Sequence, residues 1–111
     1  MTYTAKILSR NSVIVIAAFI SPYQQNRDYA REHNENFFEV YIKCPLEICE
    51  KRDAKGLYKK ARAGEIKLFT GIDDPFDEPK TPDIVVETDN CTPEDCARQI
   101  IDKAVEIGYL E

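Results

Sequence analysis

The residues most able to bind a ligand form a basic cluster in the middle of the sequence. Five cations crowd into one short stretch, and they are Lys55, Lys59, Lys60, Arg62 and Lys67. The formal net charge of the whole chain is -5, so a local basic cluster favours a small anionic ligand over a nucleic acid. These cations could instead belong to an ordinary solvated helix surface, and charge alone favours a solvated surface over a ligand-binding site.

An aromatic ring follows the basic cluster in the segment 68–73, which reads Leu-Phe-Thr-Gly-Ile-Asp. Phe69 stands in an otherwise polar stretch, where its ring could stack on a purine base. The more ordinary role for such a ring is to anchor its loop to the rest of the domain. Both interpretations of Phe69 stay open at this point.

Two further candidate positions follow apolar runs that are expected to be strands. Ser21 and Pro22 come directly after the run 12–20, where Ser suits a helix N-cap and Pro the first helical position. Backbone N–H groups at such a helix start can bind an anion, although Ser21 could be a cap and nothing more. The segment 88–92 follows another run, and adenine could lie against its backbone.

Several common catalytic and metal-binding motifs are absent from the sequence. None of its glycines belongs to a phosphate-binding P-loop or to a Gly-x-Gly-x-x-Gly fingerprint. Neither cysteine pair has Cys-x-x-Cys spacing, and His33 is the single histidine, so no metal site is predicted. We expect unpaired thiols in a cytoplasmic protein, with a disulfide left open. The cysteines are Cys44, Cys49, Cys91 and Cys96.

Strands that alternate with helices predict an α/β fold with a parallel sheet of about three strands. The expected strands are 12–20, 37–43 and 83–88, and the first should be buried on both faces because it is continuously apolar. Helices are expected at 2–9, 23–33, 45–51, 55–63 and from Thr92 to about 107. The last helix should bury the side chains of Cys96, Ile100, Ile101, Ala104 and Val105.

The length of 111 residues suits a single domain, 1–111, that can bury a core. The segment between 65 and 82 has no sustained periodicity and contains several prolines, which is typical of a lid or binding loop. No apolar run approaches the roughly 20 residues of a membrane span. We therefore expect a cytoplasmic protein that binds neither membranes nor nucleic acid.

Three segments together resemble the adenylylsulfate (APS) kinase family. They are Phe-Ile-Ser-Pro-Tyr at 19–23 with Arg27, the tract 55–67 that begins Lys-Gly-Leu-Tyr-Lys-Lys, and Phe-Thr-Gly-Ile-Asp at 69–73. The segment 45–53 also fits, and the resemblance runs along almost the full chain. It implies a partial P-loop-kinase-like sheet with flanking helices and a long lid at about 59–82.

The resemblance also implies an activity, which is transfer of the γ-phosphate of ATP, with Mg²⁺, to the 3′-hydroxyl of APS to give PAPS. Its ligands would be small nucleotides: APS, PAPS, ATP and ADP. Ser21 would lie at the reacting centre, and the APS-binding residues would be Ile20, Ser21, Lys55, Leu68 and Phe69. Arg52 and the loop with Cys91 would hold the adenine of ATP. Lys59, Lys60, Arg62 and Lys67 would belong to the lid.

One large departure from the family concerns its N-terminal portion, with the P-loop and two strands, for which the sequence shows no counterpart. One of those strands would lie between 13–20 and 37–43. We expect these segments to pair directly, to drive self-association, or to accept a complementing chain. Activity of the isolated chain should be impaired; the alternative function is a non-catalytic APS- or PAPS-binding or oligomerising remnant. Smaller departures are Asn26 and the pair Lys43-Cys44.

Overall fold

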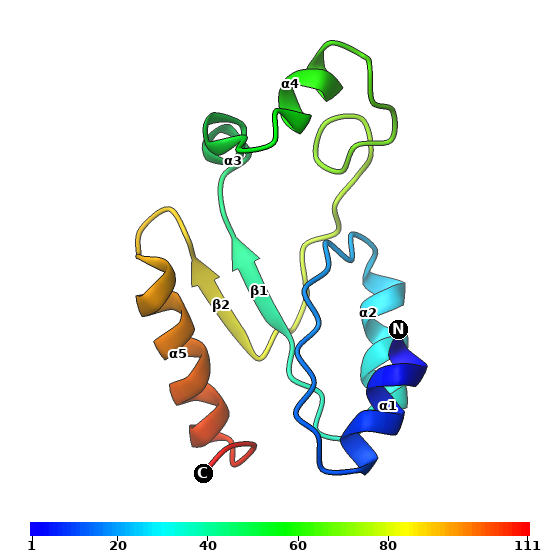
Figure 1. Cartoon of the computed structure of the whole chain (residues 1–111), viewed down its shortest axis with the longest axis vertical. Helices are drawn as coiled ribbons and strands as arrows, with labels where there is room; N and C mark the ends of the chain where they lie inside the picture. Colours follow the sequence, from blue (N-terminus) through cyan, green and yellow to red (C-terminus); the bar gives the residue numbers. More distant parts are fainter.

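The structure is a computed structural model that describes residues 1–111 and contains five helices and two strands (Figure 1). The α/β class predicted from the sequence is confirmed, and the helices fall close to their expected positions. In chain order the elements are α1 (Thr2–Arg10), α2 (Gln24–His33), β1 (Val40–Lys43), α3 (Leu46–Arg52), α4 (Leu57–Arg62), β2 (Ile84–Glu87) and α5 (Pro93–Glu106).

The two strands form a parallel pair, in which Val40 is opposite Ile84 and Lys43 is opposite Glu87. One more ladder bond follows, because the Thr88 N–H donates to the Lys43 carbonyl at 3.0 Å. Helix α5 packs along β2, and the chain between the strands rises through α3, α4 and a long loop (Figure 1). Parallel pairing therefore brings the carboxyl ends of both strands, and the loops that follow them, to one edge.

Two arginines of α2 fix the point where the strands begin. Arg27 Nε lies 3.2 Å from Glu39 Oε1, and both side chains are 9% exposed. Arg31 Nη2 bridges Glu39 Oε2 at 3.0 Å and Asp83 Oδ2 at 3.1 Å. Asp83 also accepts the Glu39 backbone N–H at 2.7 Å. The network joins α2 to the residues just before β1 and β2, so it sets the register of the pair.

The segment 13–20 differs from its prediction as a strand buried on both faces. Its backbone belongs to neither strand of the sheet. Ile14 is 73% exposed, Ile16 90% and Phe19 67%. A strand exists through hydrogen bonds to a neighbouring strand, and no ladder in residues 1–111 includes this segment. The prediction of a strand at 12–20, and of its burial on both faces, was therefore wrong for this chain.

The core of the chain is small. Only six residues are buried, and Val86 at 1% exposure is the most enclosed of them. The radius of gyration is 15.7 Å, whereas a compact domain of this length has about 13 Å. On α5, Cys96 and Ala104 are buried as expected, but Ile101 is 53% exposed and Val105 44%, because β2 covers only part of the apolar face.

None of the five helices combines the length and the apolar character that crossing a membrane requires.

Candidate functional site

A hollow opens at the carboxyl ends of the two strands, where Arg52 reaches across from α3. Its Nη2 donates to the Thr88 carbonyl at 2.8 Å, and its Nη1 lies 3.4 Å from Thr88 Oγ1. The hollow has a volume of about 370 Å³ and is lined by Arg52, Thr88, Cys91, Pro93 and Cys96. Arg52 and Cys91 thus line the same hollow. A planar cation beside backbone carbonyls and thiols suits a flat, polar ring system.

Cys91 lies between this hollow and a second one of about 350 Å³, which Gln99 and Asn90 also line. The Cys91 thiol lies 3.1 Å from the Glu87 carbonyl and 3.1 Å from the Cys96 sulfur. The pKa of the Cys96 thiol is raised, mainly by its hydrogen bond with Cys91 and to a smaller extent by burial. Thr92 caps α5 as predicted, because its Oγ1 accepts the Asp95 N–H at 3.2 Å.

The turn at Ser21 differs from its expected role as a helix cap. Helix α2 begins after Tyr23, which is its N-cap, and Ser21 instead has the left-handed φ of 43°. Its carbonyl accepts a hydrogen bond from Arg27 Nη1, while Ile20 beside it is 69% exposed. The prediction from the sequence failed here because the first turn of α2 is capped from far along the chain: the Gln24 N–H donates to Asp77 Oδ2 at 3.1 Å.

The Ser21 turn is joined to the far end of the long loop. Asp77 donates its backbone N–H to the Pro22 carbonyl at 2.8 Å, and Arg27 donates to the Asp77 carbonyl. The Tyr23 hydroxyl donates to Asp74 Oδ2 at 2.9 Å. That hydrogen bond is the main cause that raises the pKa of Tyr23. The loop residues 74–77 therefore lie against the turn that carries Ser21.

A tight turn at 68–73 presents Phe69. The Asp73 carboxylate accepts the N–H of Phe69 at 2.6 Å and that of Leu68 at 2.9 Å. These two bonds lower the pKa of Asp73, the Phe69 bond being the larger cause. Leu68 has a left-handed φ of 54° and is 76% exposed. Gly71, at φ 86°, allows the chain to turn under Phe69.

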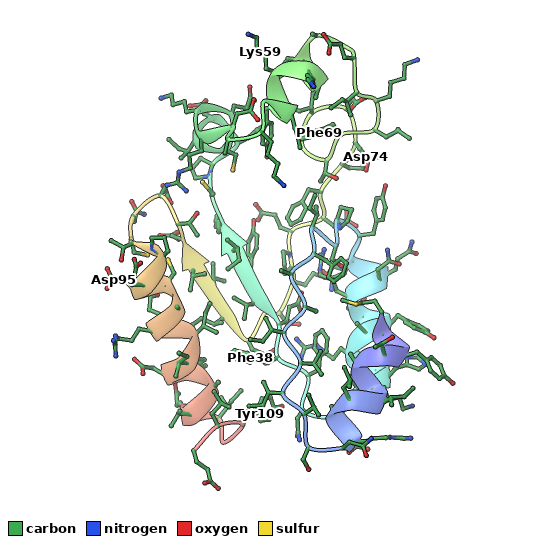
Figure 2. All side chains as sticks on the ribbon, in the orientation of Figure 1. Phe38, Lys59, Phe69, Asp74, Asp95 and Tyr109 are labelled. Carbon is green, nitrogen blue, oxygen red and sulfur yellow. The ribbon has the colours of Figure 1, made fainter.

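The Phe69 ring is half-buried and packs edge-to-face on Tyr58 of α4, with ring centroids 5.0 Å apart and planes at 70°. Figure 2 shows Phe69 on the inner side of the loop and Asp74 below it. The Asp74 N–H donates to the Phe69 carbonyl at 3.2 Å. The ring thus has the anchoring role, and its half-exposed surface leaves it able to contact a ligand as well.

The basic cluster is only partly free to meet an anion. Arg62 pairs with Glu50 through two bonds, of 2.6 and 3.2 Å, and this hydrogen-bonded pair lowers the pKa of Glu50. The four lysines are exposed and form no ion pair; Lys59 lies at the outer end of the molecule (Figure 2). They are Lys55, Lys59, Lys60 and Lys67.

A divalent cation accompanies ATP in phosphoryl transfer, and it needs several oxygen ligands in one place. No group of three or more His, Cys, Asp or Glu side chains in residues 1–111 could hold a metal ion. These residues form no cage of acidic ligands by themselves, and Mg²⁺ bound together with ATP would take most of its ligands from phosphate oxygens and water.

Comparison with known proteins settles the family. The sequence model of the adenylylsulphate kinase family matches residues 1–87. The adenylyl-sulfate kinase of Halothermothrix orenii is 50% identical over 109 residues, which is 98% of this chain and 59% of that protein. The chain belongs to the adenylylsulphate kinase family. Similarly, the adenylyl-sulfate kinase of Rippkaea orientalis is 53% identical over 108 residues, 97% of this chain and 60% of that protein.

A solved structure of the family has the same fold. The APS kinase CysC of Mycobacterium tuberculosis, in complex with AMPPNP and APS, superposes with a TM-score of 0.86 at 42% identity. The match covers 92% of this chain and 61% of that one. The chain thus spans about 60% of the length of the family members it matches.

The structure brings the predicted site residues together in two groups. Arg52 and Cys91 line one hollow, while the Ser21 turn and Phe69 are joined through Asp74. Sequence reasoning assigned no role to the residues that hold the second group in place. The sequence does contain a signal for Asp73, because an aspartate at the end of Phe-Thr-Gly-Ile-Asp can accept hydrogen bonds from backbone N–H groups of its own turn. These residues are Tyr23, Arg27, Asp73, Asp74 and Asp77.

Proposed function

We propose that this chain forms the APS-binding side and the adenine end of the ATP site of an adenylylsulfate kinase. The reaction is ATP-dependent phosphorylation of the 3′-hydroxyl of APS to give PAPS, a step of sulfate activation. The family match over residues 1–87 carries the proposal. Support comes from the similarity to a kinase solved with AMPPNP and APS, and from the hydrogen-bonded link between the Ser21 turn and the Phe69 loop.

On the APS side, Phe69 would stack on the adenine, with Leu68 beside it. Ser21 and Ile20 would lie at the phosphosulfate and the reacting hydroxyl, and Lys55 would supply positive charge. The exposed Ile20 and Leu68 are consistent with surfaces that a ligand covers. Phosphoryl transfer depends mostly on positioning and charge neutralisation in a site shielded from water. The loop that carries Phe69 would provide that shield.

On the ATP side, the hollow beside Arg52, Thr88 and Cys91 would take the adenine. The triphosphate and its Mg²⁺ would be held by residues other than these 111, since the sequence has no P-loop motif. That motif supplies much of the charge stabilisation of the transition state. We therefore expect the 111-residue chain to bind APS but to turn it over poorly.

Calorimetric titration of the chain with APS tests the proposal. Phe69→Ala should weaken binding about tenfold, because stacking an aromatic ring on a base contributes roughly 1–3 kcal/mol. Tyr3→Ala is the matched control, since Tyr3 is 71% exposed on α1, away from the loop. Binding that is absent in all three proteins, or equal in all three, would contradict the assignment of Phe69 to the APS site.

A second candidate function is a non-catalytic APS- or PAPS-binding, or oligomerising, remnant of the kinase. The exposed apolar segment 13–20 favours it, because such a surface suits a second copy or a complementing chain. An assay for PAPS formation by the 111-residue chain separates the two functions. Rapid turnover would exclude the remnant, and it would also show that a P-loop is not required.

A further inference from the structure

The thiols of Cys91 and Cys96 lie in contact at the start of α5. Their sulfur atoms are 3.1 Å apart, so a shift of about 1 Å would reach the length of a disulfide bond. Cys91 is half-buried and borders both hollows, while Cys96 is 6% exposed. A reagent can therefore reach Cys91 more readily than Cys96.

We propose that Cys91 and Cys96 form a redox-active dithiol that closes to a disulfide by exchange with a low-molecular-weight disulfide. This site goes beyond the kinase function, and it needs no ligand. Because Cys91 lines the hollow with Arg52 and Thr88, the disulfide also shifts one wall of that hollow.

The exchange balances in two steps. The Cys91 thiol loses its proton to solvent, and its thiolate attacks one sulfur of the small disulfide, which forms a mixed disulfide and releases one small thiolate. Cys96 then loses its proton, and its sulfur attacks the Cys91 sulfur and expels the second small thiolate. The two protons end on the two released thiols. The protein loses two hydrogens and two electrons, and the reagent is reduced to two thiols.

The local structure supports this order of events. Cys91 directly precedes the N-cap of α5 and is the more exposed of the two thiols. Gln99 Nε2 lies 3.7 Å from the Cys91 sulfur and can donate to it. The pKa of Cys96 is raised, first by its bond with Cys91. Cys96 is thus the thiol that keeps its proton while Cys91 reacts.

The chain contains its own control for this proposal. Cys44 and Cys49 have the same spacing in the sequence as Cys91 and Cys96. The thiols of Cys44 and Cys49 are also near one another, since burial and then a side-chain hydrogen bond with Cys44 raise the pKa of Cys49. The contact that the Cys49 sulfur makes at 3.9 Å is, however, with the Cys44 carbonyl oxygen, whereas the Cys91 and Cys96 sulfurs lie 3.1 Å apart. If sequence spacing alone decided disulfide formation, the two pairs would behave alike.

Redox titration of the 111-residue chain with mixtures of reduced and oxidised glutathione tests the site. Trypsin places each pair in one peptide, 81–98 or 44–51, so closure lowers the mass of that peptide by about 2 Da. We expect 81–98 to oxidise with an equilibrium constant at least about tenfold larger than that of 44–51. The same titration in urea should abolish the difference, because the native contact is then lost.

Two outcomes would overturn the proposal. One is peptide 81–98 retaining both thiols, or oxidising no more readily than 44–51, in the native chain. The other is an unchanged preference in urea, which would assign it to sequence and not to the fold. In the Cys96→Ser variant, oxidation should stop at the mixed disulfide between Cys91 and glutathione. In the Cys91→Ser variant, Cys96 should stay largely unmodified. The readout needs neither nucleotide binding nor kinase activity, so failure of the proposed function would not affect it.

Discussion

The hydroxyl of Tyr23 donates a 2.9 Å hydrogen bond to the carboxylate of Asp74, joining residues that are far apart in the chain. Through Pro22, Tyr23 follows the turn at Ser21, and Asp74 follows the tight turn that presents Phe69. This bond, together with those that Asp77 makes to Pro22, Gln24 and Arg27, sets the relative placement of two groups with proposed roles in APS binding.

Tyr23→Phe removes this hydrogen bond and keeps the ring. We expect APS to bind more weakly, while the midpoint of urea unfolding changes little, because the bond is only partly buried. Calorimetry and urea titration measure the two effects. Tyr29→Phe is the control, since Tyr29 stacks on His33 of the same helix. Equal APS affinity in Tyr23→Phe and the unmodified chain would show that the bond does not position the loop.

Arg27→Met leaves the buried Glu39 carboxylate with Arg31 as its only cationic partner. Breaking a buried pair from one side costs about 3 kcal/mol or more, so the free energy of unfolding should fall by about that amount. Arg98→Met, at an exposed position on α5, should change it by less than about 0.5 kcal/mol. Urea titration followed by circular dichroism measures both variants, and equal losses would contradict the proposed importance of the network.

The turn at 68–73 should depend on pH through Asp73. Because amide hydrogen bonds lower its pKa in the folded state, the carboxylate stabilises the turn above the ordinary aspartate pKa of about 3.9. That contribution is lost as the pH falls through the lowered pKa. The amide resonances of Leu68 and Phe69 should shift together over that range below pH 4 in an NMR titration. In Asp73→Asn they should not follow this titration; persistence of the shift would assign it to another group.

The exposed segment 13–20 should drive association of the chain. Light scattering should give a mass above that of the monomer that rises with concentration, because 90% of Ile16 is open to solvent. Ile16→Lys should reduce this association without lowering stability, since Lys on an unpaired extended segment opposes pairing. Ile7→Lys on α1, which is 58% exposed, is the matched control. A clean monomer at all concentrations would count against the expectation.

Local signals in the sequence were reliable where neighbouring residues decide the structure. Thr92 and Pro93 predicted the start of α5, and the Thr92 cap is confirmed by its bond to Asp95. The same reasoning failed at Ser21, because the first turn of α2 is capped by Asp77 from a distant loop. No local pattern encodes a partner at that separation.

Burial was the other property that the sequence could not settle. The apolar run 12–20 predicted a buried strand, but a strand and its burial both require neighbours, and no ladder of this chain includes the segment. For the candidate site, the resemblance paired Arg52 with the Cys91 loop; both residues line one hollow, and their role in ATP binding stays a prediction. It could not show that Arg62 is paired with Glu50, since that contact depends on how α3 and α4 fold together.

The attachment of Asp77 to Pro22 and Arg27 has a mechanical consequence for the region predicted as a lid, 59–82. Residues 74–77 are fastened to α2, and Arg62 is fastened to α3 by Glu50. Between these fixed points, residues 63–73 are held by the packing of Phe69 on Tyr58, so a flap of these residues would have to break that contact to swing about Gly64, which has φ 77°. Residues beyond 77 would travel with α2 as a strap, so opening would uncover Phe69 while leaving the turn at Ser21 in place.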